Sequence, residues 1–240
     1  MFRQADDAAI VVAKDTGRQK ASITMAKVMS PFKFRHPSSI IIAGPSGSGK
    51  TVFTTKLILE NQNLWPDTPK VVHYCYGVWQ PAFERLKKAG VHFHEGIPDP
   101  TQFDKWYPKE GGLLILDDLM EEGGKDKTVL DLFTKLSHHR NITAIMLLQD
   151  LFPPGKYSKT ISRNAHYIVA FKNPRDKVGI RTLLTQAYPV AWQEVLTAFN
   201  EVTSRPFGYM VFDFHAASSD SCRILSNVFK GEGFTHCYQF

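Results

Sequence analysis

The chain has 240 residues, of which 43% are hydrophobic and 22% charged, a composition typical of a globular protein with one substantial core. No apolar run reaches the 18 or more residues that a membrane-spanning helix needs, and the polar first residues do not resemble a secretory signal. Three cysteines make no disulfide framework, so we expect an intracellular protein of a reducing compartment that does not bind membranes.

The formal net charge of +6 is unevenly distributed along the chain. Residues 1–38 hold seven Lys or Arg against three Asp, and residues 153–181 hold seven against one, so the remainder is net acidic. Clustered positive charge is typical of proteins that bind a polyanion, nucleic acid first. A solvated basic face explains the same charge equally well, so charge alone leaves both interpretations open.

The predicted elements alternate between strands and helices. Residues 1–37 lack a clean period and are expected to form an arm at an edge of the sheet, and residues 215–240 an irregular tail. Apolar or alternating runs predict strands at 39–43, 70–76, 91–94, 113–116, 142–148, 165–171 and 208–214. Helices are expected at about 50–59, 81–88, 127–139, 175–187 and 190–200. Strands joined by helical crossovers imply an α/β fold, a mostly parallel sheet with helices on both faces, in a single domain whose core is 38–214.

A glycine-rich segment follows the first strand directly and consists of Gly44, Pro45, Ser46, Gly47, Ser48, Gly49, Lys50 and Thr51. It matches the P-loop pattern GxxxxGK[ST] and stands between a strand and a helix, as the mechanism of that motif requires. Backbone N–H groups of such a loop cradle phosphate oxygens, and the helix N-terminus adds partial positive charge. We therefore expect ATP to bind here, with Lys50 on the β- and γ-phosphates and the Thr51 hydroxyl on Mg²⁺.

Two carboxylates, Asp117 and Asp118, follow the strand at 113–116 in the manner of a Walker B motif. They would lie at the carboxyl end of a buried strand, where an open α/β sheet holds its ligand. Asp117 is expected to hold Mg²⁺, in part through water, and Asp118 to take a proton from, or orient, the attacking water. Paired acids of this kind also occur as helix N-caps, but beside a P-loop they favour nucleotide hydrolysis.

Polar residues flank the strand at 142–148 on both sides. Gln149, at its end, can donate to the γ-phosphate or hold the attacking water. Arg140, before its start, has two interpretations. It is either one of three cations, with His138 and His139, that stabilise a helix C-terminus, or an arginine finger presented to a neighbouring subunit's nucleotide.

A further ordered set of residues runs from Ser162-Arg163-Asn164 to Asn173-Pro174-Arg175-Asp176. Together with the P-loop, the acidic pair and the segment 137–149, this set resembles the genome-packaging ATPases of the FtsK–HerA superfamily. The type that it resembles is carried by large DNA viruses and Polinton/adintovirus-like elements, and the resemblance extends over about residues 38–230.

The resemblance implies an additional-strand P-loop core, with the Gln149 strand between the two Walker strands. It also implies a homo-oligomeric ring of five or six subunits that moves double-stranded DNA into a capsid or procapsid, in the host nucleus or cytoplasm or in the virion. By the same match Gln149 is the sensor and Arg140 the trans-acting finger. Many members have Asp-Glu where this chain has two aspartates, which leaves Glu121 and Glu122 as alternative bases.

Two other functions stay open. The P-loop also resembles that of nucleoside monophosphate kinases, although such a small-molecule kinase is expected to have an Arg-rich lid and no sensor strand. A DNA-binding or capsid-associated protein that uses ATP only as an assembly switch is the other alternative. The tail residues His215, Cys222, His236 and Cys237 do not match a usual zinc spacing, so we expect no metal there.

Overall fold

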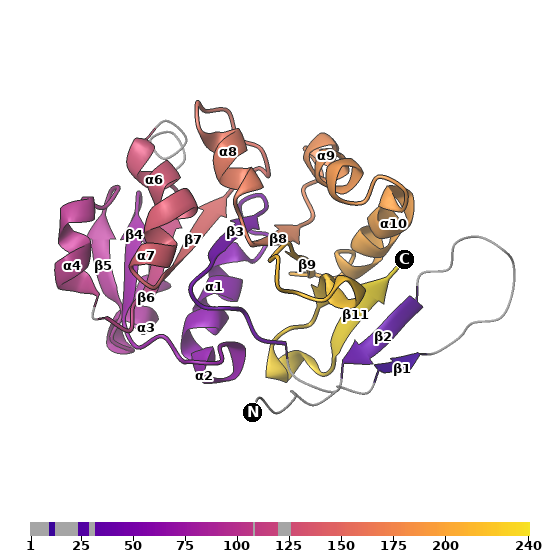
Figure 1. Ribbon diagram of the computed structural model, residues 1–240, viewed down its shortest axis with the longest axis horizontal. Helices are drawn as coiled ribbons and strands as arrows, with labels where there is room; N and C mark the ends of the chain where they lie inside the picture. Colours follow the sequence, from indigo (N-terminus) through magenta and orange to yellow (C-terminus); the bar gives the residue numbers. More distant parts are fainter. Residues whose placement is uncertain (1–9, 13–23, 29–31, 108, 120–125) are drawn as a thin grey trace, which may run out of the picture.

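One sheet, with eleven strands in the described residues, runs through the whole molecule (Figure 1). The computed structural model describes residues 10–12, 24–28, 32–107, 109–119 and 126–240. The sheet has a parallel half and an antiparallel half, which meet where β8 (Tyr167–Phe171) pairs with β9 (Tyr209–Asp213).

Six of the described strands form the parallel half. Their order, from the edge inward, is β5 (His92–Glu95), β4 (Val72–Tyr76), β6 (Gly112–Asp117), β7 (Ile142–Leu148), β3 (Ser39–Ala43) and β8. β3, β6, β7 and β8 are buried at every position, which is why their sequences are continuous apolar runs rather than alternating ones. The strand that ends at Gln149, β7, lies between the P-loop strand β3 and the Asp117 strand β6, as the family resemblance implied.

Helices cover both faces of this half, so the predicted α/β fold is confirmed. Alternate residues of β3 enable this, because Ile40 and Ile42 face one apolar cluster while Ile41 and Ala43 face the other. The first cluster is covered by α1 (Lys50–Leu59), α2 (Asn61–Leu64) and α3 (Phe83–Lys88). The second cluster is covered by α4 (Phe103–Trp106), α6 (Lys127–Asp131), the π-helical turn η2 (Leu132–Leu136), α8 (Ser158–Arg163), α9 (Lys177–Ala187) and α10 (Trp192–Val202).

The antiparallel half continues the sheet beyond β8. After β9 come β10 (Ile224–Ser226), β11 (Thr235–Gln239), β2 (Thr24–Val28) and β1 (Ile10–Val12), at the opposite end of the molecule from β5 (Figure 1). The prediction of an irregular tail after residue 214 is therefore wrong. β10 has three residues and β11 reads Thr-His-Cys-Tyr-Gln, so neither carries a clear apolar pattern, and both are defined by pairing with distant strands.

Residues just before β3 are anchored in the core. Phe34 is fully buried, with its ring centroid 5.4 Å from that of Trp65 and 5.0 Å from that of Tyr167. The backbone N–H of Arg35 donates to the Tyr167 hydroxyl at 3.1 Å. The division of the chain at 37/38 and at 214/215 stays a prediction, although Phe34 packs on the proposed core from within the proposed arm. Among the described residues, no helix is long and apolar enough to cross a membrane.

Candidate nucleotide-binding site

The P-loop is a turn between β3 and α1 that depends on its glycines. Gly49 has φ of 111°, a left-handed conformation that glycine adopts readily. A Cβ on Gly44 would lie 2.6 Å from the Cβ of Phe171, so no side chain fits there. Gly49 is the N-cap of α1 and contributes no side-chain cap to the first N–H groups of the helix. Those N–H groups are the ones that bind a phosphate at a helix N-terminus.

Lys50, the first residue of α1, is folded back on the loop. Its Nζ donates to the carbonyl oxygens of Gly44 at 2.5 Å and Pro45 at 3.1 Å. Burial lowers the pKa of Lys50, while the carboxylates of Asp117 and Asp118 act in the opposite direction. The ammonium group therefore lies among the acceptors of the loop and close to the two acids at the end of β6.

Asp117 ends β6 and is only 6% exposed. The Tyr74 hydroxyl, from the neighbouring strand β4, donates to its Oδ2 at 2.6 Å. Burial raises the pKa of Asp117, and the hydrogen bond from Tyr74 acts against that shift. A buried carboxylate held on one oxygen leaves the other available to a cation, so the ionised form gains most when a cation is bound.

The oxygen donors at this point fit Mg²⁺. Asp117 supplies a carboxylate and Thr51, in the first turn of α1, supplies a hydroxyl beside the same cavity. Among the described residues no group of three His, Cys, Asp or Glu side chains could hold a metal by itself. Mg²⁺ commonly uses one or two protein oxygens and takes the rest from water and substrate phosphates, so the two donors suffice.

Asp118 and Gln149 lie on the open side of the same cavity. Asp118 is exposed and has φ of 56°, an uncommon conformation for a residue other than glycine. Because β6 and β7 are neighbouring parallel strands, the residues that follow them meet, and the Gln149 amide Nε2 lies 3.5 Å from Asp118 Oδ1. The pair is exposed to solvent next to the buried Asp117.

A cavity of about 360 Å³ joins these groups. It is lined by Ser46, Gly47, Gly49, Lys50, Thr51, Val52, Gln80, Asp117, Asp118, Leu147, Leu148, Gln149 and Phe207. Gln80 and Phe207 were not predicted from the sequence. Phe207 belongs to an Arg-Pro-Phe-Gly turn, and no pattern in that turn connects it with the P-loop. The tertiary structure brings Phe207 to the P-loop because β9 runs antiparallel to β8. β9 therefore begins at the edge of the sheet where the parallel strands end.

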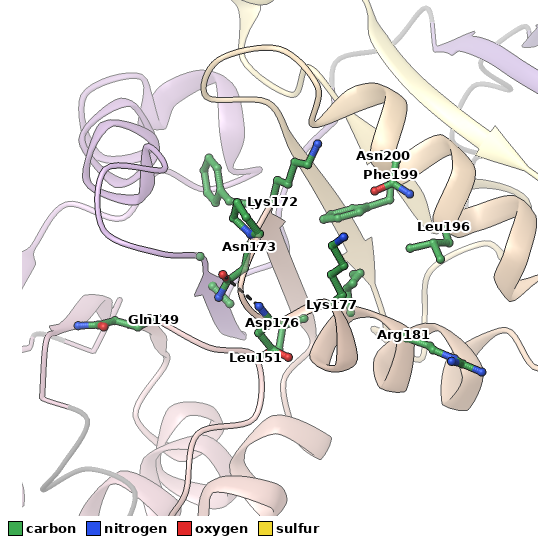
Figure 2. Close-up of a pocket in the computed structure, with 15 residues that line it drawn as sticks. Gln149, Leu151, Lys172, Asn173, Asp176, Lys177, Arg181, Leu196, Phe199 and Asn200 are labelled. Carbon is green, nitrogen blue, oxygen red and sulfur yellow. Dashed lines mark hydrogen bonds between the residues drawn. The ribbon is translucent and has the colours of Figure 1, made fainter.

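A second hollow, of about 260 Å³, borders the P-loop on the face covered by α9 and α10 (Figure 2). Gln149 lies at its border, well away from Lys177 and Asn200. Asn173 accepts backbone hydrogen bonds from Arg175 and Asp176, and the Asp176 carboxylate accepts one from Gly179 at 2.8 Å. Residues 173–176, part of the set that carries the resemblance, therefore form the turn that caps α9. The hollow has a mostly apolar lining without an acidic pair.

Arg140 lies at the opposite edge of the sheet from the cavity. It precedes β7, which has seven residues, so roughly 20 Å of strand separates it from Gln149. Its guanidinium forms an ion pair with Asp104 and lies 6.0 Å from the centroid of the Phe103 ring. Arg140 cannot reach the nucleotide cavity of its own chain, so an arginine-finger role requires a neighbouring subunit.

The basic residues of the expected DNA-binding stretch are exposed. Lys156, Lys159 and Arg163 lie on or just before α8, and Lys33 and Arg35 lie before β3. Arg35 donates to the carbonyl oxygen of Ala217 at 3.0 Å. Lys27 lies in β2. The alternative bases Glu121 and Glu122 lie outside the described residues.

The chain matches no protein-family model and no curated protein sequence. Among solved structures it is similar to the genome packaging NTPase B204 from Sulfolobus turreted icosahedral virus 2. The complex with AMP has a TM-score of 0.47 and 13% identity, over 74% of this chain and 93% of that chain. The complex with ATP-gammaS has a TM-score of 0.48 and 13% identity, over 74% and 92%. The complex with AMPPCP has a TM-score of 0.46 and 14% identity, over 74% and 93%.

Proposed function

We propose that the chain is an ATP-hydrolysing motor that moves double-stranded DNA and packages a viral or virus-like genome into a capsid. The observation that carries the hydrolytic part is that three neighbouring strands end at one cavity. β3 leads to Lys50 and Thr51, β6 to Asp117 and Asp118, and β7 to Gln149. Residues from separate parts of the chain converge where a triphosphate, a cation and a water molecule would meet.

Each group has a distinct role in the proposed reaction. Backbone N–H groups of the loop and the Lys50 ammonium bind the β- and γ-phosphates. Asp117 and Thr51 would hold Mg²⁺, which when bound neutralises charge on the phosphate oxygens. Asp118 accepts a hydrogen bond from the attacking water, and Gln149 orients that water or the γ-phosphate. Tyr74 holds Asp117 in place through its hydroxyl.

The position of β7 favours an ATPase over a small-molecule kinase. A kinase of the nucleoside monophosphate type is expected to lack a sensor strand between the two Walker strands, and this chain has β7 there with Gln149 at its end. The DNA part of the proposal is supported by the exposed basic residues on and just before α8. The ring part follows from the finger role proposed for Arg140, since an arginine so far from the cavity of its own chain could serve only a neighbouring subunit in a head-to-tail ring.

ATP hydrolysis by the purified protein, with and without duplex DNA, tests the proposal, together with the mass of the oligomer in solution. We expect turnover that duplex DNA stimulates, in an oligomer of five or six chains. Lys50→Ala should abolish turnover because it removes the cation from the phosphates, whereas Lys88→Ala, an exposed lysine of α3 outside the cavity, should leave it unchanged. Turnover that ignores DNA would favour an ATP-switched assembly protein instead.

A further inference from the structure

Phe207 is an exposed aromatic residue at the rim of the nucleotide-binding cavity. It lies in the turn between α10 and β9, is 61% exposed, and lines the cavity beside Gly49 and Lys50. An ideal Cβ placed on Gly49 would lie 3.0 Å from Phe207 Cδ1. The ring therefore lies directly against the backbone of the P-loop, at a position where that loop has no side chain.

Packing does not account for this residue. An aromatic ring that contributes to a core is normally buried, and this one is mostly exposed. Its φ of 60° is a left-handed conformation that bulky side chains adopt only at an energetic cost. The turn is closed by a hydrogen bond from the Gly208 N–H to the Arg205 carbonyl at 3.0 Å, which holds Phe207 in this conformation. Glycine or asparagine would satisfy the same backbone more easily.

The order of the strands gives a bound nucleotide a direction. Asp118 and Gln149 mark the γ-phosphate end, and they follow β6 and β7, on one side of β3. On the other side of β3 lie β8 and β9, and Phe207 precedes β9. A nucleoside triphosphate whose γ-phosphate meets Asp118 therefore extends its nucleoside across the P-loop toward the side where Phe207 lies.

We propose that the ring of Phe207 stacks on the nucleobase of the bound nucleotide and positions it, an inference that rests on the proposed function. Every base has a π-face, so stacking binds the base without reading its edge. The ring recognises that a base is present, and it contributes nothing to phosphate binding. Removing the ring should lower the affinity for nucleoside triphosphates and leave unchanged the affinity for a triphosphate that carries no base.

The test compares Mg²⁺-ATP with inorganic tripolyphosphate by isothermal titration calorimetry. Phe207→Ala should weaken ATP binding about 5- to 150-fold, the range expected for base–aromatic stacking, and leave tripolyphosphate binding unchanged. Phe207→Tyr, which keeps the ring, should retain ATP affinity. Phe234→Ala, which removes an aromatic side chain of similar exposure (58%) outside the cavity, is the matched control and should change neither affinity.

Phe207→Gly separates binding from folding. Because glycine relieves the left-handed conformation, this variant should be at least as stable to heat as the wild type and should still lose ATP affinity. Phe207→Ala with wild-type ATP affinity, or with equal losses for ATP and tripolyphosphate, would overturn the stacking role while leaving the proposed function intact. A wild-type protein that binds neither ligand would refute the proposed function and the stacking role with it.

Discussion

The parallel and antiparallel halves of the sheet do different work. In the parallel half, β3, β6 and β7 all end at one edge, and each delivers polar residues to the cavity. In the antiparallel half, the strands and turns deliver aromatic contacts to α1 instead. The Phe53 ring of α1 lies 4.8 Å from that of Tyr209 and 4.9 Å from that of Phe229.

A polar contact adds to these aromatic contacts between α1 and the antiparallel half. Glu232 accepts hydrogen bonds from Lys56 of α1 at 2.9 Å and from the Tyr209 hydroxyl at 2.5 Å. The antiparallel half thus fixes α1, the helix whose N-terminus is proposed to bind phosphate, without contributing a charged group to the cavity. Changes at the strand ends should alter rates with little effect on folding, and changes to the buried side chains that the antiparallel half packs against α1 should do the reverse.

Among changes outside the P-loop, Arg140→Ala should have the largest effect on rate. An arginine that stabilises charge on the transferred phosphoryl group contributes about 10³–10⁵-fold, so turnover should fall by that factor while ATP affinity stays nearly unchanged. Steady-state ATPase assays and ATP titrations of the purified variant measure the two quantities. Arg140 is far from the cavity of its own chain, so this result would extend the chemistry of the parallel half across a subunit boundary.

Two controls separate a finger from a local ion pair. Mixing Arg140→Ala with Lys50→Ala subunits should restore some activity. Some mixed interfaces then combine the intact P-loop of an Arg140→Ala subunit with the intact Arg140 of a Lys50→Ala subunit. Asp104→Asn removes the intrachain partner of Arg140 and should leave most of the turnover. Loss of turnover in Asp104→Asn, without complementation in mixed rings, would reduce Arg140 to its structural role.

Asp118→Asn should retain ATP binding and lower turnover by about 10²–10⁴-fold, the usual contribution of a general base. The amide keeps the shape of the side chain but cannot take a proton from water. Single-turnover hydrolysis, measured beside ATP affinity, checks the assignment. Normal turnover would move the role of base to Glu121 or Glu122, which should then be replaced in turn.

Phe229→Ala tests the antiparallel half. Phe229 is buried against α1, and truncation of a buried aromatic ring lowers the free energy of unfolding by about 3–5 kcal/mol. Denaturant unfolding of the nucleotide-free protein measures the change, with Val190→Ala, at a side chain that is 94% exposed, as a control that should stay within about 0.5 kcal/mol of the wild type. A loss of turnover in folded Phe229→Ala as large as that of Arg140→Ala would erase the contrast between the halves.

Replacing Lys156, Lys159 and Arg163 together by alanine tests whether these exposed residues on and just before α8 bind DNA. Each phosphate contact contributes about 0.9 to the slope of log affinity against log salt, so the slope should flatten by up to about 3. DNA-stimulated turnover should fall and basal turnover should stay near wild type. Filter binding at several salt concentrations checks the slope. An unchanged slope would direct attention to the arm residues Lys27, Lys33 and Arg35.

In the nucleotide-free protein, Asp117→Asn should have the smallest effect on stability, and the effect should be an increase. Burial raises the pKa of Asp117 above its usual value of 3.8, so between those two values the folded state binds more protons and wild-type stability falls as pH rises. At pH 7, without Mg²⁺, the free energy of unfolding of the asparagine variant should exceed that of the wild type by about 0.5–2 kcal/mol. Thermal melts from pH 4 to pH 8 would show that gap widening with pH. Stabilisation by added Mg²⁺-ATP should be lost in the variant.

The P-loop and the acidic pair were predictable because their demands are local. Gly49 must adopt a left-handed φ, Lys50 must begin a helix, and Asp117 must end an apolar strand, and each demand shows in adjacent residues. The alternation of strands and helices predicted the α/β fold for the same reason, since a crossover needs a continuous stretch of chain.

Only the tertiary structure decided which distant residues meet. Tyr74 and Asp117 are 43 positions apart and share a hydrogen bond because β4 and β6 are neighbours. Phe207 reaches the P-loop because β9 runs antiparallel to β8, and β11 is a strand because β10 and β2 pair with it. Such pairings depend on the packing of the whole sheet, and a short segment such as Ile224–Ser226 contains too few residues to encode its partners.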